Sequence, residues 1–374
     1  LDMYKIPILP LNQEIETKDI LKQVNHANKR LAELKGIART IPNENILINT
    51  LVLQEAKDSS AVENIVTTHD ELYKAELDKT SLTITSETKE VLHYSEALKH
   101  GFALIRKSKL LTNNIIREIQ ECLERNKAGF RNTPGTTLKN QQTGDIVYTP
   151  PQDRTDIEIY MENLELFIND DSVCEIDPLI KLAIIHHQFE SIHPFYDGNG
   201  RTGRIINILY IVIKDLLDLP ILYLSRYIIR NKTEYYRLLQ NVRDNGNWES
   251  WILFILKGIE KTAQETIELV QEIGRLMQNY KIGIKNELPN IYRHELLNNL
   301  FSHPYTKIEF VQQELNVNRQ TASKYLQKLA EKGFIKDVKV GRNKYYLNLP
   351  LIKLFMGSGK EIESSPESIE SVNS

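Results

Sequence analysis

The chain has 374 residues, too many for one ordinary domain of roughly 100–200 residues, so its length predicts two or three domains. Hydrophobic residues make up 41% and charged residues 26%, a composition able to bury a substantial core. The net charge of −3 excludes a wholly basic nucleic-acid coat protein and a wholly acidic tail protein, although it permits a local basic patch.

The two cysteines, Cys122 and Cys174, are too few for a disulfide scaffold and favour a reducing compartment. No segment reads as a targeting signal. The longest purely apolar run, Ile208–Ile213, is far shorter than the roughly 20 residues of a membrane helix. We therefore expect a soluble, cytoplasmic protein with no membrane partner.

The predicted elements are mainly helices, because apolar residues recur every three or four positions. The first dozen residues contain two prolines and are expected to be extended. Glycines, prolines and the β-prone triplet Ile146-Val147-Tyr148 predict a hairpin or flap over 127–153. Asp177 is expected to cap a helix that begins at Pro178. The other helices are expected from Thr17 to a stop at Gly36 and over 43–57, 86–107, 112–126, 203–217, 232–242 and 248–277.

From about residue 291 the pattern changes to three short helices and a β-hairpin, the order typical of a winged helix-turn-helix. The helices are expected over 292–301, 307–315 and 319–331, and the hairpin turns at 341–343. Residues 291–349 hold ten Lys/Arg against five Asp/Glu, a local charge of +5 that leaves −8 for the rest. The tail after Gly357 is rich in Ser and Glu and expected to be disordered.

The segment Ser191–Arg204, between two apolar helices, carries the clearest chemistry. Gly198-Asn199-Gly200 permits a tight turn, and a helix starts directly after it, so backbone N–H groups and the positive helix end converge on one point. Arg201 and Arg204 lie three residues apart and would clamp a polyphosphate. Asp197 is placed to hold a Mg²⁺ that bridges phosphates, and His193 to act as general base for an incoming hydroxyl.

Competing interpretations of this segment fail on spacing. There is no Gly-Lys-Ser/Thr and no preceding strand, which excludes a Walker loop and a dinucleotide-binding fold. A calcium loop would need glycine in place of Thr202 and glutamate in place of Ile208. His186, His187 and His193 lack a zinc-type spacing.

The string His193-Pro-Phe-x-Asp-Gly-Asn-Gly-Arg-x-x-Arg204 resembles the signature of Fic-domain proteins at every signature position. This resemblance implies a mainly α, Fic-type helical core with a β-hairpin flap, and an enzyme that transfers AMP from ATP to a Ser, Thr or Tyr hydroxyl of target proteins and of itself. It implies His193 as the base, Phe195 packed beneath the loop and Asp197 as the Mg²⁺ ligand. The implied nucleotide-binding residues are Gly198, Asn199, Gly200, Arg201, Thr202, Gly203, Arg204 and Tyr236.

Two other segments are similar to parts of that family. Gly144–Pro151, with Ile146, Val147 and Tyr148, resembles the flap that docks the target segment by strand addition, although an ordinary surface hairpin stays open. Tyr235-Tyr236 resembles the aromatic pair near the adenine, with Tyr236 as the better candidate of the two. That both are plain core tyrosines stays open as an alternative. Asn241 and Arg243 are weaker candidates for the ribose or adenine.

Ser59-Ser-Ala-Val-Glu63-Asn64 resembles the inhibitory pattern of the same family. A Glu63 carboxylate paired with Arg204 would occupy the partner of the γ-phosphate, so the enzyme would be autoinhibited in cis. The alternative is a helix N-terminus capped by Ser59 or Ser60, with Glu63 in solvent.

These observations divide the chain into an N-terminal helical region (1–105, inhibitory motif 59–64), a catalytic domain (106–280), a winged-helix-like domain (288–350) and a tail (357–374). The last domain would bind DNA through Arg319, Gln320, Ser323 and Lys324, with Arg342 and Lys344 on phosphates, or would bind protein. Two other functions stay open: removal of AMP or transfer of another phosphate-containing group, and a nucleotide-switched DNA-binding regulator. The resemblance also allows a homodimer.

Overall fold

The structure is a computed structural model that describes residues 4–77, 84–139, 143–340 and 343–356, and the expected disordered tail lies outside them. The chain divides into two compact units. The larger unit comprises Leu1–Arg39, Leu51–Thr67 and Thr83–Ile267. The smaller unit comprises Thr40–Thr50, Thr68–Leu82 and Glu268–Ser374.

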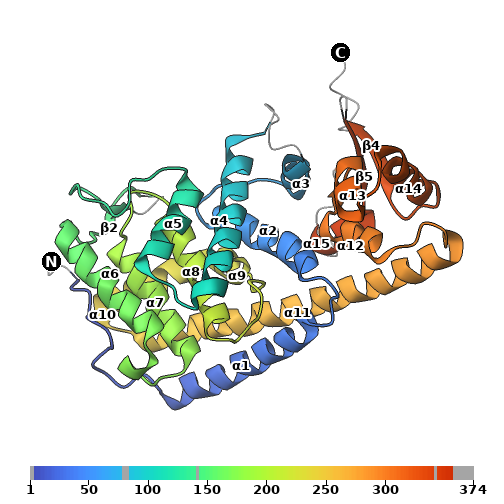
Figure 1. Ribbon diagram of the computed structural model, residues 1–374. Coiled ribbons are helices and arrows are strands. Elements are labelled where there is room, and N and C mark those ends of the chain that lie inside the picture. The colour runs from blue at the N-terminus through green and yellow to red at the C-terminus, as the bar shows by residue number, and fades with distance from the viewer. Residues whose placement is uncertain (1–3, 78–83, 140–142, 341–342, 357–374) are drawn as a thin grey trace. The chain divides into compact units, whose positions relative to one another are not determined.

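The larger unit is built almost entirely of helices, which confirms the mainly α prediction (Figure 1). Its one sheet is a small antiparallel hairpin of β1 (Leu138–Lys139) and β2 (Ile146–Tyr148), as far as the described residues show. The helices are α1 (Lys18–Ala38), α4 (Ser86–Ser108), α5 (Asn113–Glu124), α6 (Arg154–Asn169), α7 (Pro178–Ile192), α8 (Asn199–Ile213), α9 (Leu224–Arg230) and α10 (Lys232–Asn245), with a 3₁₀ turn at Asp171–Val173; α2 (Glu44–Val62) and α11 (Trp248–Glu287) contribute to both units.

The centre of the larger unit is the helix pair α7 and α8. Asp177 caps α7 as predicted, because its side chain accepts a hydrogen bond from the Leu179 N–H at 2.8 Å. Every residue from Leu179 to Ile192 is buried, so α7 is enclosed by protein on all its faces. Helix α8 packs against α7, α4 and α5. The loop between α7 and α8 is therefore fixed at both ends by buried helices.

The N-terminal residues follow an extended path over the larger unit, as expected from their prolines. Asn163 of α6 binds the backbone of Leu9 on both sides, accepting from its N–H at 2.8 Å and donating to its carbonyl at 2.9 Å. Gln188 of α7 donates to the Pro7 carbonyl at 2.7 Å. These side-chain contacts replace the strand partners that a lone extended segment lacks.

The smaller unit has the predicted order of three helices and a hairpin. Helix α14 covers the predicted range, and its N-cap Asn318 accepts from the Thr321 N–H at 2.8 Å. The antiparallel sheet has the strand order β3-β5-β4, with Tyr305 opposite Leu347. The elements are α3 (His69–Leu77), α12 (His294–Ser302), β3 (Tyr305–Thr306), α13 (Ile308–Leu315), α14 (Arg319–Glu331), β4 (Lys336–Val340), β5 (Asn343–Leu347) and α15 (Leu349–Met356). Of the predicted turn, residues 341 and 342 lie outside the described chain.

Several elements differ from the predictions. Helix α1 continues past Gly36 to Ala38, and α8 begins at Asn199 rather than Gly203. Helix α2 runs on to Val62, so Ser59 and Ser60 lie near its C-terminal end and the proposed N-cap there is wrong. Its last turns carry no apolar period because the polar residues Asp58 and Ser59 pack there against Arg226 and Arg204. The predictions also missed α3, α6, α9, α15 and β3.

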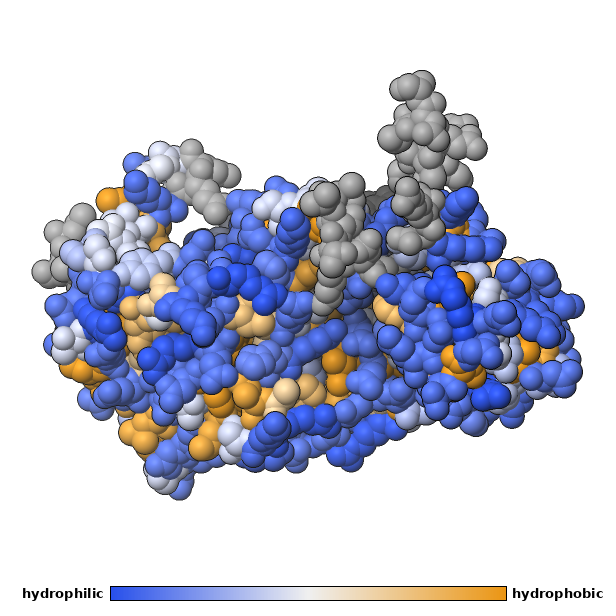
Figure 2. Space-filling view, turned by 45° about the horizontal axis from the view of Figure 1, so that its top comes forward, coloured by the Kyte–Doolittle hydropathy of each residue, from blue (hydrophilic) through white to orange (hydrophobic). Residues whose placement is uncertain are grey.

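No helix of the described residues is long and apolar enough to cross a membrane. Figure 2 shows a face on which hydrophilic side chains predominate, with hydrophobic ones in groups between them.

Candidate functional site

The α7–α8 loop contains the candidate site. His193 ends α7 in the left-handed conformation (φ 49°), and Gly198 (φ 75°) precedes α8. Asn199 closes the loop from within: its Oδ1 accepts from the Phe195 N–H and its Nδ2 donates to the Phe195 carbonyl, both at 2.8 Å. The first N–H groups of α8 have no acceptor within their own helix, so the closed loop presents them as an anion-binding site.

The phenylalanine of the loop packs beneath it, as the resemblance implied. Phe195 is fully buried, and its ring centroid lies 5.3 Å from that of Phe130 and 6.4 Å from that of Phe189. These ring contacts join the loop to α7 and to the segment after α5. The aromatic packing therefore holds the loop in place without any ligand.

Arg204 lies against the C-terminal end of α2. Its Nη2 donates to Oε1 of Glu63 at 2.8 Å and to the Ser59 carbonyl at 3.0 Å, and its Nε donates to the Ser59 Oγ at 2.7 Å. Arg204 is only 2% exposed. Burial opposes the charged form of Glu63, but the guanidinium outweighs it and lowers the pKa of that carboxyl. The structure thus joins Glu63 to Arg204, as the sequence analysis expected, and adds Ser59 as a second partner of that arginine.

Asn64 explains the last position of the Ser-x-x-x-Glu-Asn pattern. It has φ 64°, in the left-handed region that asparagine tolerates better than most residues. The N–H of Ile65 donates back to the Ser60 carbonyl at 3.0 Å, which ends the helix and turns the chain. Lys232 holds the Asn64 side chain at 2.8 Å.

Two glycines of the loop are required by close approach. A Cβ on Gly200 would lie 2.4 Å from Oε1 of Glu63 and 3.1 Å from Nη1 of Arg204. A Cβ on Gly198 would lie 2.3 Å from Oε1 of Glu124. A side chain at either position would therefore displace a carboxylate that lies on the anion-binding loop.

Arg201 is held by two carboxylates that the sequence analysis missed. Its Nη1 lies 3.0 Å from Oε2 of Glu90 on α4, and its Nη2 lies 2.9 Å from Oε1 of Glu124 on α5. Burial raises the pKa of Glu124, although Arg201 opposes the shift. Neither glutamate belongs to a motif; only the burial of α4 and α5 against α8 brings them to the loop.

The imidazole of His193 is neutral at pH 7. Burial, followed by Arg131 and Arg243, lowers its pKa to about 4, although Glu63 and a hydrogen bond to the Glu190 backbone act in the opposite direction. A neutral imidazole is the form that accepts a proton, as a general base must. Glu190, another residue that the sequence analysis missed, is buried beside Arg204, and burial raises its pKa to about 7.

Asp197 is exposed beside the loop and accepts from the Gly198 N–H at 2.7 Å. Among the described residues no group of three or more His, Cys, Asp or Glu side chains could hold a metal ion. A single carboxylate next to a phosphate site fits Mg²⁺, because this ion keeps several waters and takes its other ligands from phosphates.

The remaining predicted residues separate into core and surface. Tyr235 is buried and its hydroxyl lies 2.9 Å from Nε2 of His186, whereas Tyr236 is 40% exposed beside it. Thr202 and Gly203 are buried in α8. Asn241 accepts from the side chain of Asn245 at 2.7 Å.

In the flap, Ile146 and Val147 are 59% and 45% exposed, whereas Tyr148 faces inward and is 6% exposed. The Tyr148 hydroxyl donates to the Ser191 carbonyl at 2.9 Å. The guanidinium carbon of Arg243 lies 4.0 Å from the Tyr148 ring centroid. The two exposed side chains face solvent, and the buried tyrosine anchors the flap.

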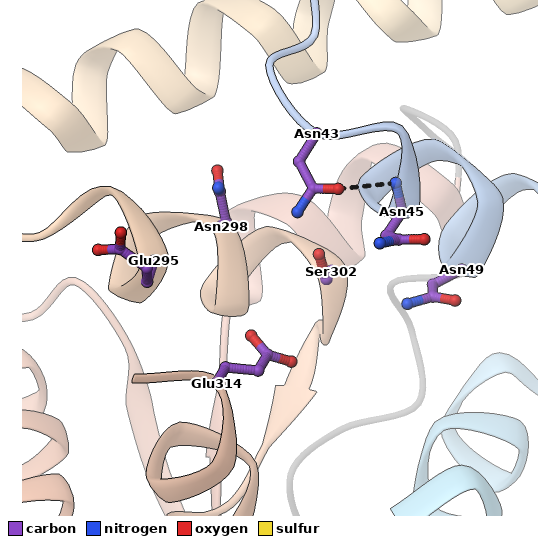
Figure 3. Close-up of a pocket in the computed structure, with 7 residues that line it drawn as sticks. All are labelled: Asn43, Asn45, Asn49, Glu295, Asn298, Ser302 and Glu314. Atoms are coloured by element: carbon purple, nitrogen blue, oxygen red, sulfur yellow. Dashed lines mark hydrogen bonds between the residues drawn. The ribbon is translucent and has the colours of Figure 1, made fainter. Parts of the chain in front are cut away.

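A separate cavity of about 310 Å³ lies in the smaller unit, and no predicted site residue lines it. Figure 3 shows its polar lining, with the Asn45 N–H donating to Oδ1 of Asn43 at 3.0 Å. The lining residues are Asn43, Asn45, Asn49, Glu295, Asn298, Ser302 and Glu314.

Family models match three segments of the chain: Fic/DOC family N-terminal over 21–103, Fic/DOC family over 110–211, and the C-terminal domain of protein adenylyltransferase SoFic-like over 276–351. The protein adenylyltransferase Fic of Drosophila virilis is 25% identical over 280 residues, covering 72% of this chain and 52% of that protein. The protein adenylyltransferase fic-1 of Caenorhabditis elegans is 32% identical over 113 residues, covering 29% and 21%. The chain thus spans between about a fifth and a half of the length of these relatives.

Solved structures show the same fold. A Fic family protein from Desulfovibrio desulfuricans G20 has a TM-score of 0.56 and 18% identity, covering 88% of this chain and 96% of its own. Fic-1 from C. elegans has a TM-score of 0.52 and 20% identity, covering 67% and 73%. From its three matched segments and its fold, the chain belongs to the Fic/DOC family and carries a SoFic-like C-terminal domain.

Proposed function

We propose that the protein is an adenylyltransferase that moves AMP from ATP to a hydroxyl side chain of a target protein and of itself. The observation that carries the proposal is the anion-binding loop at the start of α8, flanked by the two buried arginines and the neutral imidazole of His193. The relatives from D. virilis and C. elegans are named protein adenylyltransferases, which supports the same reaction.

In this proposal the target hydroxyl loses its proton to His193 while its oxygen attacks the α-phosphorus. The new O–P bond forms as the bond to the leaving oxygen breaks, and pyrophosphate departs with its electron pair. The N–H groups of Asn199 and Gly200 bind the phosphates, and Arg201 and Arg204 bind their outer oxygens; the Gly198 N–H is donated to Asp197. Asp197 would hold Mg²⁺, which neutralises phosphate charge when bound. Tyr236 would contact the adenine, and Ile146 and Val147 would dock the target.

We infer that Glu63 inhibits the enzyme in cis. Its carboxylate accepts a hydrogen bond from Nη2 of Arg204. The Ser59 carbonyl accepts from the same nitrogen, and the Ser59 hydroxyl accepts from Nε. The γ-phosphate would lose its partner, and ATP would bind in a pose unsuited to in-line attack. The 31% exposure of the Glu63 side chain leaves it able to move away without opening the core.

The test compares wild type, Glu63→Gly and Glu63→Gly/His193→Ala with ATP labelled at the α- or γ-phosphate. We expect Glu63→Gly to incorporate α-label into itself and into lysate proteins, no γ-label in any variant, and no label with His193→Ala. Incorporation of γ-label would make the protein a kinase instead. Equal α-labelling of wild type and Glu63→Gly would overturn the inhibitory role alone.

A second candidate, removal of AMP, is favoured by one observation: the Glu63 carboxylate lies so close to the anion-binding loop that a Cβ on Gly200 would be 2.4 Å from its Oε1. There it could orient water toward a bound phosphodiester. Incubating AMP-modified protein from the Glu63→Gly reaction with unlabelled wild type tests this. Release of AMP by wild type but not by Glu63→Gln would support it, and stable label would exclude it.

For the smaller unit we propose duplex DNA as the ligand. Arg319, Gln320 and Lys324, near the start of α14, are exposed, as the reading surface of a winged helix must be. Arg319 is also paired with Glu309 at 2.6 Å on the surface, a contact that a phosphate could replace at little cost. Salt-dependent retardation of duplex DNA that Lys324→Glu weakens would support this, and no retardation at low salt would favour a protein partner.

A further inference from the structure

Arg131 is fully buried, yet no carboxylate pairs with it in the described part of the chain. Burial lowers its pKa, as expected for a charge removed from water without a counter-ion. Such a position is costly and needs compensation by other acceptors. The acceptors are the backbone carbonyls of Ile192, His193 and Pro151.

Arg131 binds the end of α7 and the base of the flap at once. Its Nε donates to the His193 carbonyl at 2.8 Å, and its Nη2 donates to the carbonyls of Ile192, at 3.4 Å, and Pro151. Its own backbone N–H donates to the Pro194 carbonyl at 2.8 Å. One residue, through its side chain and its backbone N–H, therefore fixes the backbone before, at and after His193 and joins it to the segment that follows β2.

The same helix end has a second attachment to the flap. The Tyr148 hydroxyl donates to the Ser191 carbonyl at 2.9 Å, and Nε of Arg243 donates to the Ser191 Oγ at 3.1 Å. The last carbonyls of a helix have no partner within it. In α7 they are satisfied by Tyr148 of β2 and by Arg131, so the flap and the end of α7 form one hydrogen-bonded group.

We propose that Arg131 is a positioning residue that ties the flap to His193, so that a hydroxyl on a flap-docked target meets the imidazole at a fixed place. The inference rests on the proposed adenylyl transfer for its kinetic consequence, but its structural consequence is independent of it. Arg131 does not contact the reacting atoms in this assignment; it acts through the backbone of His193.

The charge of Arg131 and its shape have separable effects. Burial lowers the pKa of His193 most. The charged groups that act on it are Arg131 and Arg243, which lower it, and Glu63, which raises it, as does a hydrogen bond to the Glu190 backbone. Lysine keeps the charge but loses the planar fork that reaches several carbonyls. Glutamine loses the charge and keeps part of the hydrogen bonding. Arg131→Lys and Arg131→Gln therefore test position and charge separately.

The kinetic experiment uses Glu63→Gly as background and measures target modification. Arg131→Lys is expected to lower kcat by about 10²-fold, the cost of a misplacement near 1 Å, with the KM for ATP unchanged. Arg154→Gln is the control, because Arg154 is an exposed arginine paired with Glu158 at 2.7 Å; it should keep full activity. An unchanged kcat in Arg131→Lys would overturn the proposal.

The second experiment needs neither ATP nor catalysis. The His193 imidazole, labelled with ¹³C and assigned by its loss in His193→Ala, is titrated by NMR. We expect a midpoint of about 4 in wild type, Arg154→Gln and Arg131→Lys, and a higher midpoint in Arg131→Gln. A folded Arg131→Gln with the wild-type midpoint would refute the contact even if the protein is no adenylyltransferase. If Arg131→Gln does not fold, Tyr148→Phe, which removes the other flap donor, must lower kcat; full activity in that variant refutes the coupling.

Discussion

Arg201 and Glu124 form an ion pair of 2.9 Å between the first turn of α8 and the last turn of α5. Arg201 is 5% exposed and the Glu124 side chain 13% exposed, so water screens the pair weakly. Asp197 and Glu90 add to the negative charge around Glu124. Both arginines beside the anion-binding loop are thus paired with carboxylates, Arg201 with Glu124 and Arg204 with Glu63. A phosphate that binds there must compete with these carboxylates.

Glu124→Gln is expected to lower the KM for ATP severalfold in the Glu63→Gly background. The amide is isosteric but no longer repels phosphates beside Gly198, a change worth on the order of 1 kcal/mol. Initial rates at varied ATP concentration measure it, and Glu118→Gln, an exposed glutamate of the same helix, is the control. A KM that rises in Glu124→Gln would mean that the carboxylate orients Arg201 for phosphate rather than competing with it.

Gly200→Ala should destabilise the wild type more than it destabilises Glu63→Gly. The new Cβ would lie 2.4 Å from the Glu63 carboxylate, and such crowding costs about 1–3 kcal/mol. With Glu63 removed, the methyl group meets only the flexible end of Arg204, so the cost should fall. Chemical denaturation of the four proteins of this double-mutant cycle gives the coupling free energy. Additive effects would show that Glu63 does not occupy this place in solution.

The sequence predicted those parts of the site that depend on local backbone. The spacing from His193 to Arg204 already implies a helix end, a turn and a helix start. The pairing of Glu63 with Arg204 also followed from a short pattern. Such features are readable because a few adjacent residues determine them.

The rest of the site depends on contacts between distant elements. Glu90, Glu124 and Arg131 come from three separate segments and have no motif around them. Their roles arise only when α4, α5 and the flap base pack around the loop. The end of α2 was missed for the same reason: Asp58 and Ser59 interrupt the apolar period, and arginines of α8 and α9 bury them.

The pH dependence of the activated enzyme should reflect a depressed histidine pKa. The base must be neutral, and the pKa of His193 is about 4, so transfer by Glu63→Gly should not decline as the pH falls through the usual value of 6.5. Glu63 raises this pKa, so its removal cannot move the decline to higher pH. Rates of α-label incorporation between pH 5 and 8 test this at saturating ATP. A half-loss near pH 6.5 would mean that His193 is solvated in the active enzyme.

Glu55 attaches the inhibitory helix to the core. It is buried in α2, one turn before Ser59, where it accepts hydrogen bonds from the Tyr94 hydroxyl at 3.2 Å, the Ser225 N–H at 3.2 Å and the Ser225 hydroxyl. Burial raises its pKa to about 8 despite these donors. The folded protein therefore holds a proton on Glu55 at neutral pH that the unfolded chain, with a pKa near 4.5, has released.

Glu55→Gln should stabilise the protein in a pH-dependent way. Between pH 4.5 and about 8 the folded state binds more protons than the unfolded state, so wild-type stability falls as the pH rises through this window. Glutamine resembles the protonated acid in shape and does not titrate. The two proteins should thus have similar unfolding free energies near pH 4, and the variant should gain on the order of a few kcal/mol by pH 8. Urea denaturation at both pH values measures the difference, with exposed Glu162→Gln as control. If the difference in unfolding free energy between the two proteins does not widen with pH, Glu55 is ionised in the folded state. Its hydrogen bonds would then hold α2 through a charged carboxylate rather than through a protonated one.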